Sequence, residues 1–194
     1  MNISTEQVKK LRDDTGVSVM QCRKALEEAM GDEEKAKIIL RKISKQGAEK
    51  KAGRTLGAGT VASYIHSNGT VGTIVELLCE TDFVARNDDF KSLSRDIAMH
   101  ITALAPEYVK QEDVPEEAKT KAKELFASEL SDKPKEMHAK IIEGKLANYL
   151  AEKVLLDQNF IKNPEVTIKS LVEEASQKFG ERTEIGRFSR FSIN

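Results

Sequence analysis

Apolar residues in the first 54 positions recur every three or four residues, which is the spacing of one face of an α-helix. Polar stretches interrupt this pattern, so the region predicts a small bundle of three short helices. The predicted starts are capping boxes at Ser4–Gln7 and Ser18–Gln21 and a cap at Asp32, and the predicted stops are Gly16 and Gly31. The basic stretch 45–54 is interpreted as a helical linker with a solvated charged face.

The pattern then changes to runs rich in β-branched residues, at 60–66 and 70–79. Ser67-Asn68-Gly69 lies between them, and Asn-Gly between two such runs is a strong hairpin signal. Both residues tolerate the positive φ of a type I′ turn. The sequence therefore predicts a β-hairpin over residues 60–79.

Helical spacing returns after the hairpin. The expected boundaries are a helix closed by Pro106, one opening at Pro115, a break at 131–134 before a long helix, one from Thr167 to Gly180, and a final strand at 183–193. The two charged helices around the break carry narrow apolar stripes and predict an antiparallel helical hairpin. Because the strands come from distant segments, the predicted class is α+β rather than alternating βαβ.

This organisation predicts an N-terminal three-helix bundle, then an antiparallel-sheet core packed with helices and carrying the helical hairpin. The expected domains are 1–54 for the bundle and linker, 55–106 for the first part of the core, 107–153 for the coiled-coil-like hairpin, and 154–194 for the second part of the core. The hairpin at 107–153 is also a candidate dimerisation element.

Charge and composition narrow the function classes. Lys and Arg total 31 against 32 Asp and Glu, whereas a protein that binds nucleic acid directly normally carries a basic excess. No apolar run approaches the roughly 20 residues that cross a bilayer, and Met1–Lys10 lacks the apolar stretch of a signal peptide. Cys22 and Cys79 lie far apart in apolar segments. We therefore expect a reduced, cytoplasmic protein without a nucleic-acid or membrane partner.

Residues with catalytic potential are few. His66, His100 and His138 form no metal-ligand motif, and the sequence lacks a phosphate-binding loop, a dinucleotide fingerprint and a nucleophile elbow. Cys79, at the end of a predicted strand, fits a buried thiol better than a nucleophile. We expect a protein that is not an enzyme and binds no cofactor or metal.

The connection after the hairpin, Cys79-Glu80-Thr81-Asp82-Phe83-Val84, leaves two interpretations open. Connections are where rigid scaffolds display functional groups. Periodicity alone favours the plainer interpretation, in which Thr81 or Asp82 caps a helix and Phe83 packs into the core.

Residues 79–87 (CETDFVARN) are similar to the signature of the elongation factor Ts family, in which T-D-F-V follows a strand. Further matches, in order, are Leu11-Arg12, Thr15-Gly16, Met20, Cys22, Lys24-Ala25-Leu26, Gly31-Asp32, Ala36, Leu40-Arg41, Lys133–Glu136, Ile142–Leu146, Gln158, Phe160, Pro164, Thr167–Leu171 and Arg187-Phe188. The chain resembles the short, single-module form of this family, because only one copy of the hairpin is found.

The resemblance implies a guanine-nucleotide exchange factor for a GDP-bound translational GTPase resembling elongation factor Tu, with GDP released by disturbing the Mg²⁺ site. It also implies a bundle of the ubiquitin-associated (UBA) type, a homodimer, and a heterotetramer with the GTPase. The implied contacts are Thr81, Asp82, Phe83 and Val84 near the magnesium site, Arg12, Val19 and Met20 from the bundle, and, as a weak contact, His66. Without the resemblance, Arg12 could equally be a solvated charge and Met20 a core residue.

Two other function classes stay open at this point. One is a docking module whose bundle binds a peptide or a ubiquitin-like surface without exchange activity, and the other is a thiol enzyme using Cys79. Gln21 departs from the family pattern, which has an acidic residue at that position, and this could alter the contact made by the bundle.

Overall fold

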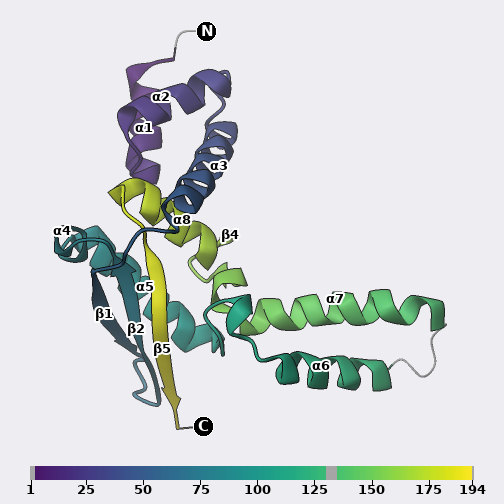
Figure 1. Ribbon diagram of the computed structural model, residues 1–194. Coiled ribbons are helices and arrows are strands. Elements are labelled where there is room, and N and C mark those ends of the chain that lie inside the picture. Colours follow the sequence, from purple (N-terminus) through teal and green to yellow (C-terminus); the bar gives the residue numbers. More distant parts are fainter. Residues whose placement is uncertain (1–2, 130–134, 194) are drawn as a thin grey trace. The chain divides into compact units, whose positions relative to one another are not determined.

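The computed structural model describes residues 3–129 and 135–193 (Figure 1). The fold is α+β, with a helical N-terminal region and a three-stranded antiparallel sheet. Contacts divide the chain into two compact units, the first formed by 1–61, 76–94 and 170–185, the second by 62–75, 95–169 and 186–194. The domain limits at 54, 106 and 153 stay a prediction, and the break expected at 131–134 lies outside the described residues.

The bundle in the first unit consists of α1 (Thr5–Thr15), α2 (Val19–Glu28) and α3 (Glu33–Lys51). The first capping box is confirmed, because Ser4 Oγ accepts from the Gln7 amide and Gln7 Oε1 accepts from the Ser4 amide, both at 3.1 Å. The second capping box is wrong in part. Ser18 Oγ accepts from the Gln21 amide at 3.4 Å, but the Gln21 side chain accepts from the Ser18 hydroxyl instead of the backbone.

The two glycines predicted to end helices lie at different distances from the helix ends. Gly16 ends α1 with φ at 68°, as predicted. Helix α2 ends at Glu28, and the left-handed turn that follows is shared by Met30 and Gly31. Asp32 caps α3 through the Lys35 amide at 3.0 Å. Helix α3 continues to Lys51, so most of the basic stretch expected as a helical linker forms its last turns. The bundle core is made by Val8, Leu11, Val17, Cys22, Ala25, Leu26, Ala29, Ala36 and Leu40.

The sheet has the order β1 (Ala58–Ile65), β2 (Val71–Cys79), β5 (Glu184–Ser192), which confirms the hairpin and the final strand. The predicted type I′ turn is wrong. Gly69 donates to the His66 carbonyl at 2.8 Å, and φ is positive at Gly69 but not at Asn68. This is the pattern of a type I turn followed by one left-handed glycine. The longer loop needs only that one special residue.

Helix α5 spans Asp88–Leu104, and its part from residue 95 onward, which belongs to the second unit, contacts one face of the strands there. Thr102 Oγ1 donates to Thr73 Oγ1 at 2.9 Å, and Arg190 Nε donates to the Thr102 carbonyl at 3.1 Å. On the alternate face of the same strands, Ile65, Ile74 and Phe191 are exposed. Within the second unit, the strands are therefore contacted by α5 on one face and expose apolar side chains on the other.

Helices α6 (Glu116–Ser128) and α7 (Lys135–Lys153) lie side by side in the second unit and confirm the helical hairpin (Figure 1). Phe126 meets Tyr149 edge-on at 6.2 Å between ring centroids, and Lys145 lies over the Phe126 ring while pairing with Glu129. Pro115 caps α6 and precedes its first residue.

A second, smaller sheet was not predicted. Strands β3 (Asn159–Phe160) and β4 (Asn163–Thr167) pair antiparallel, and α8 (Ile168–Phe179) follows directly. Single-turn 3₁₀ helices at Gln111–Asp113 and Leu155–Asp157 complete the described elements. Buried His100 pairs with Gln158 at 2.9 Å, and burial lowers the pKa of its imidazole. No helix in the described part of the chain combines the length and apolarity needed to span a membrane.

Candidate functional site

The connection after β2 forms the single-turn helix α4 (Asp82–Ala85) with Thr81 at its N-cap. We call residues 80–87 the tip. Within it, Val84 is 4% exposed and Ala85 is 9% exposed, whereas Phe83 is 82% exposed. Adjacent helical residues point about 100° apart, so burying 84 and 85 turns residue 83 outward. The interpretation in which Phe83 packs into the core is therefore wrong.

The outer surface of the tip combines an aromatic ring with charge. Asp82 Oδ2 pairs with Arg86 at 2.8 Å, and both side chains are largely exposed. A shallow hollow is lined by Asp82, Phe83, Arg86 and Asn87. The Val84 side chain faces the core and does not contribute to the outer surface of the tip. Val84 therefore packs α4 against the core.

Glu181, which follows α8, holds the base of the tip. Its Oε2 accepts from the backbone amides of Glu80 at 3.1 Å and Thr81 at 3.0 Å, and its Oε1 accepts from the Thr81 hydroxyl at 2.6 Å. The Thr81 side chain is thus turned to Glu181 and makes no bond to the helix it caps.

Glu80 makes the reciprocal contact. Its Oε1 accepts from the Arg182 amide at 2.5 Å and from Arg54 Nη1 at 3.1 Å. The Arg182 amide, assisted by Arg54, lowers the pKa of the Glu80 carboxyl. Arg182 also donates to the Arg54 carbonyl at 2.6 Å. Three segments distant in sequence therefore meet beneath the tip.

The thiols are poorly placed for nucleophilic chemistry. Cys79 is fully buried, its thiol donates to the Thr81 carbonyl at 3.2 Å, and burial is the main cause that raises its pKa. Cys22 is also buried with a raised pKa. A raised pKa disfavours the reactive thiolate, so the thiol-enzyme alternative loses its physical basis.

The candidate contacts on the bundle are all at the surface. Met20 is 70% exposed and Val19 is 54% exposed, and Arg12 is exposed on α1. The interpretation of Met20 as a core residue is therefore wrong. Met30 is also strongly exposed on the bundle, and it was not singled out from the sequence.

His66 lies exposed at the end of the hairpin, in the second unit. Its Nδ1 is 3.4 Å from the Tyr64 hydroxyl, and the two rings are tilted against each other. Tyr64 and His66 thus form a local pair.

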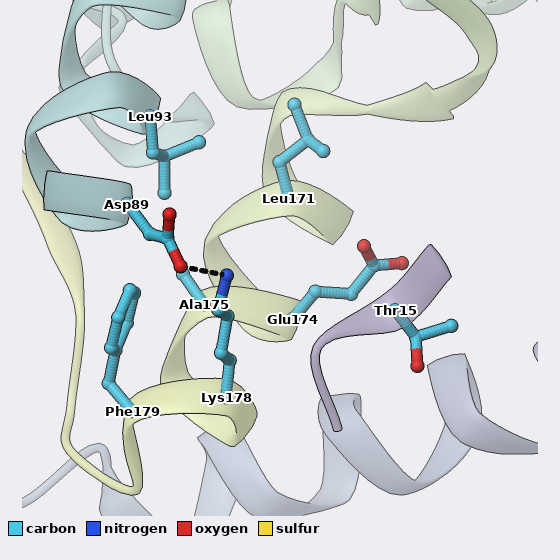
Figure 2. A pocket seen from close by; sticks show the side chains of 8 residues that line it. All are labelled: Thr15, Asp89, Leu93, Leu171, Glu174, Ala175, Lys178 and Phe179. Carbon is cyan, nitrogen blue, oxygen red and sulfur yellow. Dashed lines mark ion pairs between the residues drawn. The ribbon is translucent and has the colours of Figure 1, made fainter. Parts of the chain in front are cut away.

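A cavity of about 150 Å³ in the first unit lies beside α8 (Figure 2). Lys178 pairs with Asp89 across it at 2.8 Å, and Arg41 lies 3.5 Å from Glu174. Burial is the main cause that raises the pKa of the Glu174 carboxyl. Besides Asp89, Glu174 and Lys178, the cavity is lined by Thr15, Leu93, Leu171, Ala175 and Phe179. Across residues 3–129 and 135–193, no cluster of three His, Cys, Asp or Glu side chains could hold a metal ion.

Sequence reasoning missed the residues that support the tip. Glu181 and Arg182 lie about a hundred positions after the segment they hold, and no local pattern links them to it. The one available signal was Gly180, at which the helix was predicted to end. That end places Glu181 and Arg182 in the connection directly after the helix.

Comparison with known proteins agrees with the motif on the tip. The family model described as "Elongation factor TS" matches residues 3–194. Similar chains named elongation factor Ts include those of Carboxydothermus hydrogenoformans, 48% identical over 98% of this chain and 89% of the relative, and Thermotoga petrophila, 46% identical over 100% and 97%. That of Coprothermobacter proteolyticus is 47% identical over 100% of this chain and 99% of its own. The chain belongs to the elongation factor Ts family.

Proposed function

We propose that this protein is a guanine-nucleotide exchange factor that releases GDP from a translational GTPase resembling elongation factor Tu during polypeptide elongation in the cytoplasm. The observation that carries the proposal is the 82% exposure of Phe83 on a helix whose next two residues are buried. An apolar ring held outward on a rigid support fits insertion into a partner. Membership of the elongation factor Ts family supports the choice of partner.

The release of tightly bound GDP sets an energetic requirement. A nucleotide held at nanomolar affinity is bound by roughly 12 kcal/mol. An exchange factor that binds the nucleotide-free GTPase most tightly lowers the affinity of the GTPase for nucleotide. By linkage, bound nucleotide lowers the affinity of the GTPase for the exchange factor to the same extent. The factor therefore acts through binding energy and remains unchanged, which is why we do not class it as an enzyme.

In the proposed mechanism, Phe83 wedges between apolar elements of the GTPase domain and shifts the groups that position Mg²⁺. Asp82 bonds to elements near the metal and holds them displaced. The phosphate charge is then uncompensated, and GDP leaves. Thr81 and Val84 fix the tip from below through Glu181 and the core.

The tip does not supply enough energy alone. Burial of one phenylalanine yields only about 1.5–3 kcal/mol. Wider contacts must contribute, and the exposed Arg12, Val19 and Met20 on the bundle are suited to them. His66 is a weaker candidate for a further contact. We propose no cofactor and no nucleic-acid or membrane partner for this chain.

The open sheet face supports a homodimer, and hence a heterotetramer with two GTPases. In the second unit, Ile65, Phe191 and Ile193 are each at least 68% exposed, and Ile74 is 49% exposed. A large exposed apolar patch commonly marks an interface. Light scattering should give twice the chain mass, reduced by Phe191→Ser. If Leu125→Ser on the helical hairpin reduces the mass instead, the hairpin is the dimer contact.

Turnover tests the exchange function against a plain docking module. The GTPase is loaded with fluorescent GDP, and this protein is added at about one-twentieth of its concentration in excess unlabelled GTP. An exchange factor should empty the whole GTPase pool, whereas a docking module can affect only its stoichiometric share. Cys79→Ser should retain full activity, because the thiol takes no part.

A further inference from the structure

We propose that Glu181 is a positioning residue for nucleotide exchange, whose carboxylate fixes the tip so that Phe83 points toward the GTPase. This inference rests on the exchange function proposed above and deepens it. It adds a residue from the connection after α8 to a motif that is otherwise continuous in sequence.

The tip cannot define its own geometry. Helix α4 has four residues, far below the length at which an isolated helix is stable. Its N-cap, Thr81, makes no side-chain bond to the helix, and its ion pair, Asp82–Arg86, is exposed to water. The direction of Phe83 therefore depends on what holds the tip from outside.

Two anchors are present. Val84 and Ala85 bury one side of α4, which sets how far the helix stands from the core. The three hydrogen bonds of Glu181 then fix the backbone at Glu80 and Thr81, directly before the residue that carries the acidic group. Apolar burial has no direction, whereas these bonds do.

Glu181 is itself well fixed. It follows Gly180, whose φ of 74° turns the chain away from α8. The next residue, Arg182, donates its amide to Glu80 and its guanidinium to the Arg54 carbonyl. Glu80 and Glu181 thus bind each other's backbone segments, and the two acidic side chains form a reciprocal clamp beneath the tip.

Loss of the carboxylate should affect positioning more than folding. Thr81 is exposed and Glu80 is partly exposed, so water can satisfy both freed amides and the Thr81 hydroxyl, and the buried core under α4 is unchanged. Glutamine provides a matched replacement. Its amide oxygen can accept both backbone N–H groups, and its amide nitrogen can donate to the Thr81 hydroxyl, so all three contacts survive without the charge.

The experiment compares the full-length wild type with Glu181→Ala, Glu181→Gln and, as a control on an exposed glutamate of the second unit, Glu165→Ala. Release of fluorescent GDP from the GTPase is measured against factor concentration. We expect Glu181→Ala to lower kcat/KM by about tenfold or more, because small misplacements of a reacting surface cost that much. Glu181→Gln and the control should stay within about threefold of wild type. Equal activity of Glu181→Ala and wild type would overturn the proposal, as would equal loss in Glu181→Ala and Glu181→Gln.

A double-mutant cycle separates positioning from a direct or global effect. If Glu181 acts through Phe83, adding Glu181→Ala to Phe83→Ala should cause little further loss. The same fold-loss in both backgrounds would show that Glu181 acts independently of Phe83, and the proposal would fail.

Amide hydrogen exchange on the free protein needs no GTPase and keeps the inference distinct from the proposed function. In Glu181→Ala, the peptide covering 80–87 should exchange about tenfold faster, with α5 unchanged, and Glu181→Gln should resemble wild type. Unchanged exchange in 80–87, or faster exchange throughout the chain, contradicts positioning. If wild type releases no GDP, the exchange function fails, while this result still decides whether Glu181 orders the tip.

Discussion

Arg86 Nη2 lies 2.8 Å from Asp82 Oδ2, so the acidic group of the tip is already paired across the single turn of α4. Both side chains are at least 70% exposed. An exposed i,i+4 pair contributes only about 0.3–0.5 kcal/mol, because water and salt screen it. The pair is therefore weak enough for a partner to replace.

This relationship predicts a separation between stability and activity at Asp82. Asp82→Ala and Arg86→Ala should each change the free energy of unfolding by no more than about 0.5 kcal/mol in a urea titration. Asp82→Ala should slow GDP release more than Arg86→Ala does, because the carboxylate is the group that engages the GTPase. The reverse order would assign the contact to Arg86.

Phe83 and Val84 are neighbours in sequence with opposite environments, at 82% and 4% exposure. Phe83→Ala should leave the free energy of unfolding within about 0.5 kcal/mol of wild type. Val84→Ala removes buried methyl groups and should cost about 1–3 kcal/mol. Chemical denaturation measures both. A large stability loss in Phe83→Ala would mean that the ring contributes to the core after all.

Glu174 predicts a pH dependence of stability. Burial raises its pKa above the ordinary 4.5, so the folded state binds a proton more tightly than the unfolded state does. Stability from this group is therefore lost as pH rises from about 4.5 through the raised folded value. Glu174→Gln removes this partly buried charge. It should be more stable than wild type at pH 7, and the difference should shrink toward pH 4.

Denaturation across pH 4–7.5 checks this expectation. Arg41, 3.5 Å away, is partly exposed and can be hydrated when its partner becomes neutral. A lower stability of Glu174→Gln at pH 7 would show that the Arg41 pair outweighs the cost of burying the carboxylate.

Magnesium provides a test of the route by which the tip acts. If the factor displaces the groups that hold Mg²⁺, chelating the metal should speed GDP release without the factor and leave little for the factor to add. The acceleration caused by this protein should fall by about tenfold or more in excess EDTA. The same acceleration with and without Mg²⁺ would rule out the metal site as the route.

Local patterns were sufficient for much of the fold. Gly16 ends α1 and α5 ends just before Pro106, because glycine and proline act on the residues next to them. The hairpin over 60–79 followed from β-branched runs around Asn68-Gly69, but its turn type did not. Asn-Gly permits the type I′ turn without requiring it, and the loop length decided the outcome.

Features set by tertiary contacts were outside the reach of the sequence. The two-residue strand Asn159–Phe160 is too short to show alternation. The four residues of α4 are too few for periodicity to decide whether Phe83 faces inward, and the resemblance to a family was needed to favour display. The bond from Thr81 to Glu181 spans 100 residues. Such a contact exists only once the sheet and α8 are in place.

The most direct measurement of the central claim is the rate of fluorescent GDP release from the Mg²⁺-bound GTPase with substoichiometric wild type or Phe83→Ala. Burial of the ring is worth about 1.5–3 kcal/mol, which corresponds to roughly 10–150-fold in rate if it is realised in the transition state. We predict a loss of that size in Phe83→Ala with unchanged stability. A folded Phe83→Ala variant that releases GDP as fast as wild type would contradict the account.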